Sequence, residues 1–312
     1  MGNKILYALL FAWVKIHALL PMSVLYLLSD ILYCLIYYVV RYRRNTVGKN
    51  LKNSFPDKTK KECTMLERRF YHHFSDYIVE TIKLAHISQE ELLRRATIRN
   101  PDVVSDLMER GFTTFIMVMG HYGNWEWFSG TAPWFEGRTT IFQVYRPLTN
   151  KAFDRLFRYL RTRFHSNGIK KNEALRDIIN LARNKTNALV VFVADQTPSK
   201  ANLHYWTNFL HQDSAIHAGP ERIAKKLCLP VIFADVQKIR RGYYIVDLKL
   251  ITEQANNTAD FWITEQYARM METCILRDPA CWLWTHNRWK HKRMENAEYR
   301  MQNDTRITNH AN

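Results

Sequence analysis

Hydrophobic and polar positions alternate along this chain with two periods, which together predict an α/β protein. Short apolar runs rich in β-forming residues predict buried strands at residues 114–119, 139–145 and 188–194. Apolar positions at helical spacing predict helices at residues 62–86, 101–110, 151–164, 172–183 and 259–277 and within 214–227. Residues 231–238 and 243–251 predict a hairpin that turns at Arg240-Arg241-Gly242. Because strands and helices alternate, we predict a mostly parallel central sheet flanked by helices.

The N-terminal region has a different pattern. Apolar residues dominate positions 5–40, with interruptions at Lys15, His17, Pro21 and Asp30, and the basic segment RYRRNTVGKNLKN follows directly. Positive charge beside an apolar segment attracts anionic lipid and marks the cytoplasmic side. A removable signal peptide fits poorly, because no small-residue cleavage site precedes a polar sequence. We predict a membrane anchor that either spans the bilayer or lies in its interface; the alternative is an amphipathic helix pair packed on a soluble domain.

These patterns divide the chain into three predicted parts. Residues 1–45 form the apolar anchor and its basic flank, residues 46–295 the catalytic domain, and residues 296–312 a polar, frayed tail. The formal net charge of +16 predicts a partner of negative charge: nucleic acid, anionic lipid or an acidic carrier protein. Five cysteines without a regular spacing favour reduced thiols and a domain that faces the cytosol.

The stretch TTFIMVMGHYGNWEWF at residues 113–128 is the strongest candidate for a site. Gly120 ends the apolar run, His121 follows it, and Glu126 comes five residues later in what reads as the first turn of a helix capped by Asn124. From that turn, the Glu126 carboxylate is expected to reach the imidazole and fix its tautomer. His121 and Glu126 are therefore predicted as a general base and its orienter. The alternative is a chance pairing, which spacing alone does not exclude.

Three predicted strands end in polar residues: Gly120-His121, Tyr145-Arg146 and Asp195-Gln196. In a parallel sheet these ends open onto the same edge, which is where such sheets place their sites. Arg146 is a candidate for binding a phosphate or an oxyanion, and Asp195 for binding a substrate hydroxyl or holding Arg146. The alternative for these two residues is a structural ion pair.

With these residues in view, GHYGNWEW resembles the H-x4-D/E motif of the lysophospholipid acyltransferase superfamily. More narrowly, the chain resembles the lauroyl and myristoyl acyltransferases of lipid A biosynthesis. The resemblance runs from about residue 41 to 290 and rests on motifs in the expected order: YRRNTVGKNLKNSFP, Tyr145-Arg146-Pro147, Asp195-Gln196, Gly219-Pro220-Glu221 and WTHNRWK at 284–290. Glu126 stands where much of the wider superfamily has Asp, which leaves the carboxylate chemistry unchanged.

The resemblance implies a glycerol-3-phosphate acyltransferase-like fold and transfer of an acyl group to a hydroxyl of a lipid A precursor. The donor is an acyl carrier protein thioester or acyl-CoA, and the enzyme faces the cytoplasm at the bacterial inner membrane. Besides the catalytic pair, we predict that five residues bind substrate: Gly120, Asn124, Arg146, Asp195 and Gln196. An activated thioester needs neither a metal nor a further cofactor, because a base and oxyanion donors suffice.

Two alternatives stay open. One is an acyltransferase whose acceptor is another glycolipid, a phospholipid or an aminolipid; the more distant one is a non-catalytic membrane-binding protein on the same fold. A nucleic-acid partner is not predicted, because the apolar N-terminal segment is out of place in such a protein. The sequence leaves the oligomeric state and the acyl chain length undecided.

Overall fold

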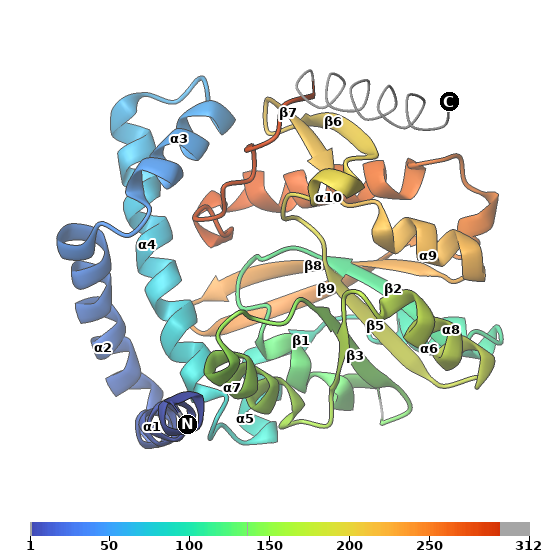
Figure 1. Ribbon diagram of the computed structural model, residues 1–312, viewed down its shortest axis with the longest axis horizontal. Helices are drawn as coiled ribbons and strands as arrows, with labels where there is room; N and C mark the ends of the chain where they lie inside the picture. The colour runs from blue at the N-terminus through green and yellow to red at the C-terminus, as the bar shows by residue number, and fades with distance from the viewer. Residues whose placement is uncertain (1, 136, 294–312) are drawn as a thin grey trace, which may run out of the picture.

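A seven-stranded sheet forms the centre of the computed structural model, which describes residues 2–135 and 137–293 (Figure 1). Its strands, from one edge to the other, are β1 (Ala96–Ile98), β9 (Tyr243–Thr252), β8 (Val231–Arg240), β2 (Thr114–Met119), β5 (Ala188–Val193), β3 (Thr140–Tyr145) and β4 (Asn167–Lys170). All neighbouring strands are parallel except β8 and β9. The predicted mostly parallel sheet is thus confirmed, and so is the hairpin of β8 and β9.

The strand ends that were predicted to meet do meet. Met119 of β2 pairs with Val193 of β5, and Phe192 of β5 pairs with Val144 of β3. Because these three strands are parallel neighbours in register, the residues after them emerge at one edge of the sheet.

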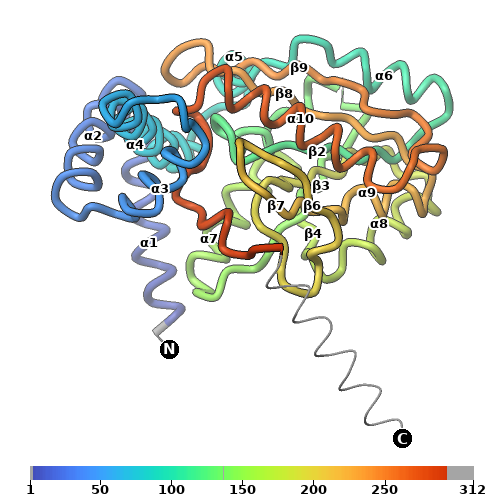
Figure 2. Tube along the Cα trace, turned by 90° about the horizontal axis from the view of Figure 1, so that it is seen from above, coloured from blue at the N-terminus to red at the C-terminus, as the bar shows by residue number. Residues whose placement is uncertain are grey.

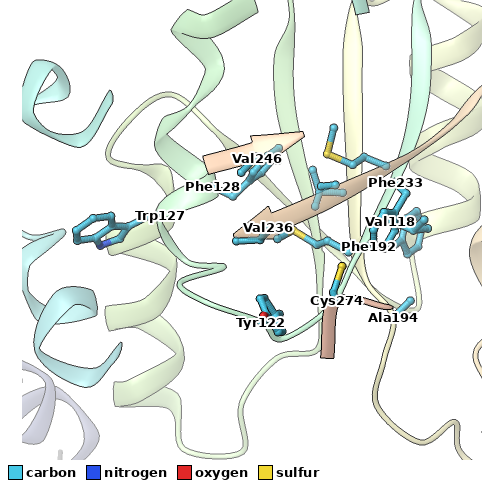
Figure 3. Packing of buried hydrophobic residues seen from close by; sticks show 14 of the residues in the cluster. Val118, Tyr122, Trp127, Phe128, Phe192, Ala194, Phe233, Val236, Val246 and Cys274 are labelled. Atoms are coloured by element: carbon cyan, nitrogen blue, oxygen red, sulfur yellow. The ribbon is translucent and has the colours of Figure 1, made fainter. Parts of the chain in front are cut away.

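The core follows from the apolar runs of the central strands. Every residue of β2 is buried, and so is all of β5 except its last residue. Val118 pairs with Phe192 on one side and with Phe233 on the other, so these side chains form a row across three strands (Figure 3). Burying a side chain of this size contributes about 1.5–3 kcal/mol, so the row fixes the register on which the strand ends depend.

Helices cover both faces of the sheet. They are α5 (Gln89–Arg95), α6 (Asp102–Glu109), α7 (Lys151–Thr162), α8 (Ala174–Arg183), α9 (Gly219–Leu227) and α10 (Trp262–Arg277). Four strands were not predicted: the short edge strands β1 and β4, and the separate antiparallel pair β6 (Tyr205–Phe209) and β7 (Gln212–Ile216). Strands β1 and β4 are too short to show a period of their own.

The N-terminal helices pack against the body. Helices α1 (Gly2–Ala18) and α2 (Met22–Cys34), with the π-helical turn Leu35–Val40, lie beside α4 (Lys60–Lys83), while α3 (Arg44–Ser54) follows the basic flank (Figure 1). Ser29 donates to the Asp76 carboxylate at 2.8 Å, and Arg241 bridges Asp30 and Asp76, each at 2.6 Å. The N-terminal helices are therefore packed on the rest of the protein across the predicted boundary near residue 45.

The outer faces of these helices remain apolar. Exposed side chains on them include Ile5, Leu9, Trp13, Ile16, Leu27, Ile31 and Val39. Among the described residues, the segment Met22–Val40 is the one helix long and apolar enough to cross a membrane. Helix α1 extends away from the body toward its free end (Figure 2).

The C-terminal segment returns to the loop that follows β2. Gly123 donates to the carbonyl of Cys281 at 2.9 Å, and Leu283 donates to the carbonyl of His121 at 3.1 Å. The Asn50 amide of α3 donates to the carbonyls of Trp284 and His286 at 2.9 and 3.0 Å. Two motifs far apart in sequence thus hold each other beside His121. The tail predicted to be frayed, residues 296–312, lies outside the described residues.

Candidate active site

His121 follows β2 through a glycine that the packing requires. A Cβ built on Gly120 would lie 2.4 Å from the sulfur of Met271 on α10 and 3.6 Å from the Asp195 carboxyl carbon. A side chain at this position would displace the end of the Met271 side chain, while Asp195 would lie at an ordinary contact distance. We therefore assign to Gly120, predicted as a substrate-binding residue, the task of letting the chain pass between α10 and Asp195.

The imidazole of His121 is hydrogen-bonded to Asp195, two residues after the end of β5. Its Nδ1 lies 2.6 Å from Asp195 Oδ1, and the indole of Trp282 donates to the other carboxylate oxygen at 2.7 Å. Burial of Asp195 acts to raise the pKa of its carboxyl, but His121 and Trp282 outweigh it, and the pKa lies below its ordinary value. Asp195 is therefore a carboxylate at neutral pH, and it favours the tautomer with the proton on Nδ1.

The opposite ring nitrogen of His121 faces Gln196. Gln196 Nε2 lies 3.3 Å from His121 Nε2, and the Trp125 ring meets the imidazole edge-on at 5.0 Å between centroids. The His121 side chain is 18% exposed, whereas that of Asp195 is 3% exposed. A substrate hydroxyl that replaces the Gln196 amide would thus meet an unprotonated nitrogen.

Glu126 is not the partner of His121, contrary to the prediction. Its buried carboxylate accepts two hydrogen bonds from Arg161 of α7, from Nε at 2.7 Å and from Nη2 at 2.6 Å. Burial acts to lower the pKa of Arg161, and Glu126 raises it. The chain after Asn124 forms a tight turn and the 3-10 helix Trp127–Gly130 instead of an α-helix, and it is Trp125 that contacts the imidazole.

Asn124 caps this turn, as predicted, but both groups of its amide are engaged within the protein. Its Oδ1 accepts from the Trp127 backbone at 3.3 Å, and its Nδ2 donates to Glu80 of α4 at 2.8 Å. Glu80 also accepts from the hydroxyls of Tyr26 and Tyr244, and its backbone carbonyl accepts from the Trp127 indole. Asn124 therefore holds the loop after β2 to α4 through Glu80. Substrate binding by Asn124 stays a prediction.

Arg146 lies at the predicted edge but does not pair with Asp195, whose two oxygens are taken by His121 and Trp282. The Arg146 side chain is exposed, and its charge adds to burial in lowering the pKa of Lys171. The predicted structural ion pair is thus wrong. Substrate binding by Arg146 stays a prediction.

The closing motif contributes two residues that the prediction did not include. His286 Nε2 accepts from the Thr197 backbone at 3.3 Å, and burial lowers the pKa of His286 to about 4. Burial lowers the pKa of Arg288 to about 10, and its Nε and Nη1 have no hydrogen-bond partner among the described residues. Both side chains interact electrostatically with Asp195. In the sequence both residues belong to the WTHNRWK motif of the family resemblance, but nothing in that motif indicates that they lie beside Asp195.

Two other kinds of chemistry find little support at this edge. Burial raises the pKa of the thiols of Cys274 and Cys281, which keeps them protonated and poor nucleophiles. Within residues 2–135 and 137–293, no group of three or more His, Cys, Asp or Glu side chains could hold a metal ion. What the site offers is a histidine oriented by a carboxylate, which suits proton removal from a hydroxyl.

The family model of the bacterial lipid A biosynthesis acyltransferases matches residues 3–291. The chain belongs to this family. A search of curated proteins finds none with significant similarity to the sequence. As a lipid A biosynthesis acyltransferase, the protein requires an acyl donor and a lipid A acceptor. The matched range includes both the segment 43–54, which contains Asn50, and the segment 281–288, whose carbonyl groups Asn50 binds.

The buried carboxyl below the site predicts a pH dependence of stability. Burial raises the pKa of Glu80 to about 7 from 4.5. A carboxyl whose pKa is raised on folding stabilises the protein fully below its unfolded pKa, and this stabilisation is lost as pH rises through the folded pKa. Between pH 4.5 and 7 the loss amounts to about 3 kcal/mol. Glu80→Gln should remove this pH dependence, because glutamine does not ionise. The variant should therefore gain stability relative to wild type as pH rises.

The measurement is urea unfolding of both proteins at intervals from pH 4.5 to 8. Glu109→Gln, at an exposed carboxyl on α6, is the control and should run parallel to wild type. A constant difference between wild type and Glu80→Gln across this range would contradict the assignment of a protonated, buried Glu80.

Proposed function

We propose that this protein transfers a fatty acyl group from an acyl carrier protein thioester, or from acyl-CoA, to a hydroxyl of a lipid A precursor. The observation that carries the proposal is the His121–Asp195 hydrogen bond of 2.6 Å, which leaves the other imidazole nitrogen beside Gln196. Membership of the lipid A biosynthesis acyltransferase family supports the substrate class.

In the proposed reaction, the acceptor hydroxyl displaces the Gln196 amide and donates to His121 Nε2. As the hydroxyl oxygen attacks the thioester carbonyl carbon, its proton moves to Nε2, and Asp195 stabilises the imidazolium. The tetrahedral intermediate then collapses, the carbon–sulfur bond breaks, and the imidazolium returns its proton to the leaving thiolate. The products are an ester and a free thiol, so atoms and charge balance. The Gln196 amide is a candidate donor to the transient oxyanion.

Glu126 has a different proposed part from the one its spacing predicted. Through two hydrogen bonds it fixes the guanidinium of Arg161, and removing either partner of such a buried pair leaves the other uncompensated, at a cost of about 3–5 kcal/mol. We therefore treat Glu126 as a positioning residue, which acts on the reaction through Arg161.

The protein is proposed to lie in the interface of the bacterial inner membrane, with its catalytic domain facing the cytoplasm. The exposed apolar faces of α1 and α2 support attachment. Asp30 argues against a spanning helix, because it lies near the middle of Met22–Val40 with its side chain 46% exposed and paired with Arg241. An ionised side chain at the bilayer centre costs about 2.5–3.5 kcal/mol even on insertion scales.

The catalytic proposal predicts that His121 and Asp195 act as a unit. His121→Ala and Asp195→Asn should each lower kcat by on the order of 10²–10⁴, the range expected for loss of a general base or of its orientation. The double variant should be little worse than the worse single variant, because the residues serve one proton transfer. Purified enzyme, labelled acyl carrier protein and a lipid A precursor in detergent, with free fatty acid followed in parallel, provide the measurement.

Trp282→Phe is a milder variant for comparison. It removes one hydrogen-bond donor to Asp195 but keeps an aromatic ring, so kcat should fall less than in Asp195→Asn. Near-wild-type transfer by His121→Ala would defeat the proposed mechanism. Transfer by wild type to another glycolipid or to a phospholipid, but not to lipid A precursors, would keep the chemistry and change the acceptor.

The interfacial proposal predicts that the outer faces of α1 and α2 carry the attachment. Exchanging four exposed side chains for glutamine, at Leu9, Ile16, Leu27 and Ile31, should weaken binding to phosphatidylglycerol-containing vesicles more than about 100-fold. Four exposed apolar residues on other elements, Met65, Ile239, Leu250 and Leu276, are the control set and should leave binding unchanged. Vesicle sedimentation measures both sets. Equal losses in the two sets would show that attachment is not confined to these helices.

A further inference from the structure

A cavity beside the N-terminal helix contains none of the residues that take part in the proposed proton transfer. Its volume is about 620 Å³, and its walls come from α1, α7 and the strands β3 and β4. Figure 2 shows α1 and α7 as neighbours on this side of the molecule. Cavities of this size hold drug-sized molecules or substrate head groups.

The walls carry an excess of positive charge. Four cationic side chains line the cavity, Arg155, Arg158, Arg161 and Lys170, against one carboxylate, Glu173. Glu173 lies 3.2 Å from Lys170, and Arg161 is bound by Glu126. The positive charge left for a ligand is therefore that of Arg155 and Arg158.

The arginines of α7 keep donors available. Arg155 lies over the ring of Tyr7 at 4.1 Å, and no carboxylate pairs with it among the described residues. Arg158 is 54% exposed and lies 3.4 Å from Asp154, a contact on the surface of the same helix. Guanidinium groups bind phosphate through paired N–H donors, so two of them on adjacent turns suit a phosphate ester.

The remaining lining suits a sugar. Tyr145 and Tyr159 offer aromatic faces with hydroxyl tips, and Gln143 and Asn167 offer amides. A few polar groups among aromatic faces is the usual make-up of a pocket that orients a small polar molecule. Together with the arginines, this set fits a phosphorylated sugar better than a bare ion.

The cavity also lies between helix α1, the proposed membrane contact, and the part of the protein that carries His121. Tyr7 belongs to α1, whose outer face is exposed and apolar, and Arg161 binds Glu126 of the motif loop. Strands β3 and β4 are two and three positions from β2 in the sheet, which corresponds to about 10–14 Å from the strand that carries His121. A head group held here would leave another part of the same molecule within reach of His121.

We infer that this cavity binds the phosphate-bearing sugar of the acceptor lipid, with Arg155 and Arg158 as the phosphate ligands. The inference rests on the proposed function, because it assigns the site to the acceptor of that reaction. The acyl donor also carries a phosphate in its pantetheine arm, so the test must separate the two sources.

The test measures steady-state kinetics of Arg155→Gln, Arg158→Gln and the double variant in detergent micelles. The double variant should raise the KM for the phosphorylated acceptor about 10- to 100-fold, the range for loss of charge-assisted hydrogen bonds, and leave kcat and the donor KM unchanged. With an acceptor stripped of its phosphate, wild type and variant should become equal. Both arginines are exposed, so the melting temperature should not change.

Arg176→Gln is the matched control: it removes an exposed arginine near the cavity that does not line it, and it should keep wild-type kinetics. A rise in donor KM, or an equal loss with the dephosphorylated acceptor, would overturn the inference. If wild type does not acylate lipid A precursors at all, the proposed function fails. Equilibrium binding of the same lipid to the His121→Ala protein then tests the cavity separately from the reaction. If the arginine variants bind the phosphorylated lipid more weakly and the dephosphorylated lipid equally well, the inference about the cavity is supported. If they bind the phosphorylated lipid as well as the protein with both arginines does, the inference is refuted.

Discussion

The hydrogen bond between His121 Nδ1 and Asp195 is the interaction on which the rest of the site depends. It exists because β2 and β5 are parallel neighbours in register, so that the residues after them meet. Burial would normally disfavour the Asp195 carboxylate, and two donors on opposite oxygens reverse that preference. The second donor, Trp282, comes from the C-terminal segment, which explains why that segment returns to the loop after β2.

The sequence predicted the central strands β2, β3 and β5, the hairpin of β8 and β9, and the edge where the central strands end, because long apolar runs and parallel topology determine them. It also placed Asp195 and Gln196 beside His121. The orienter was assigned wrongly because Glu126 is the nearest carboxylate along the chain, whereas Asp195 is the nearest in space. No spacing rule reports that Arg161 occupies both Glu126 oxygens. Glu80 and Arg288 were missed for the same reason: their roles arise from long-range packing.

Helix α7 joins the apolar N-terminal helices, which are the proposed membrane side, to the proposed catalytic side of the molecule. This helix packs on α1 through Phe11 and Tyr159, and it binds the motif loop through Arg161. The arginines of α7 have different surroundings: Arg161 is bound by Glu126, while Arg155 and Arg158 line the cavity beside α1 with no such buried partner. A lipid substrate entering from the interface would meet that cavity on its way to His121.

The claim that Asp195 orients His121 can be measured without turnover. In protein labelled with ¹⁵N-histidine, the Nδ1 proton of His121 should give a downfield resonance, because it is donated to a carboxylate. This account predicts that the resonance is lost in His121→Ala and in Asp195→Asn and survives in Glu126→Gln. A resonance that persists in Asp195→Asn and disappears in Glu126→Gln would contradict it, and would return Glu126 to the place that its spacing first predicted.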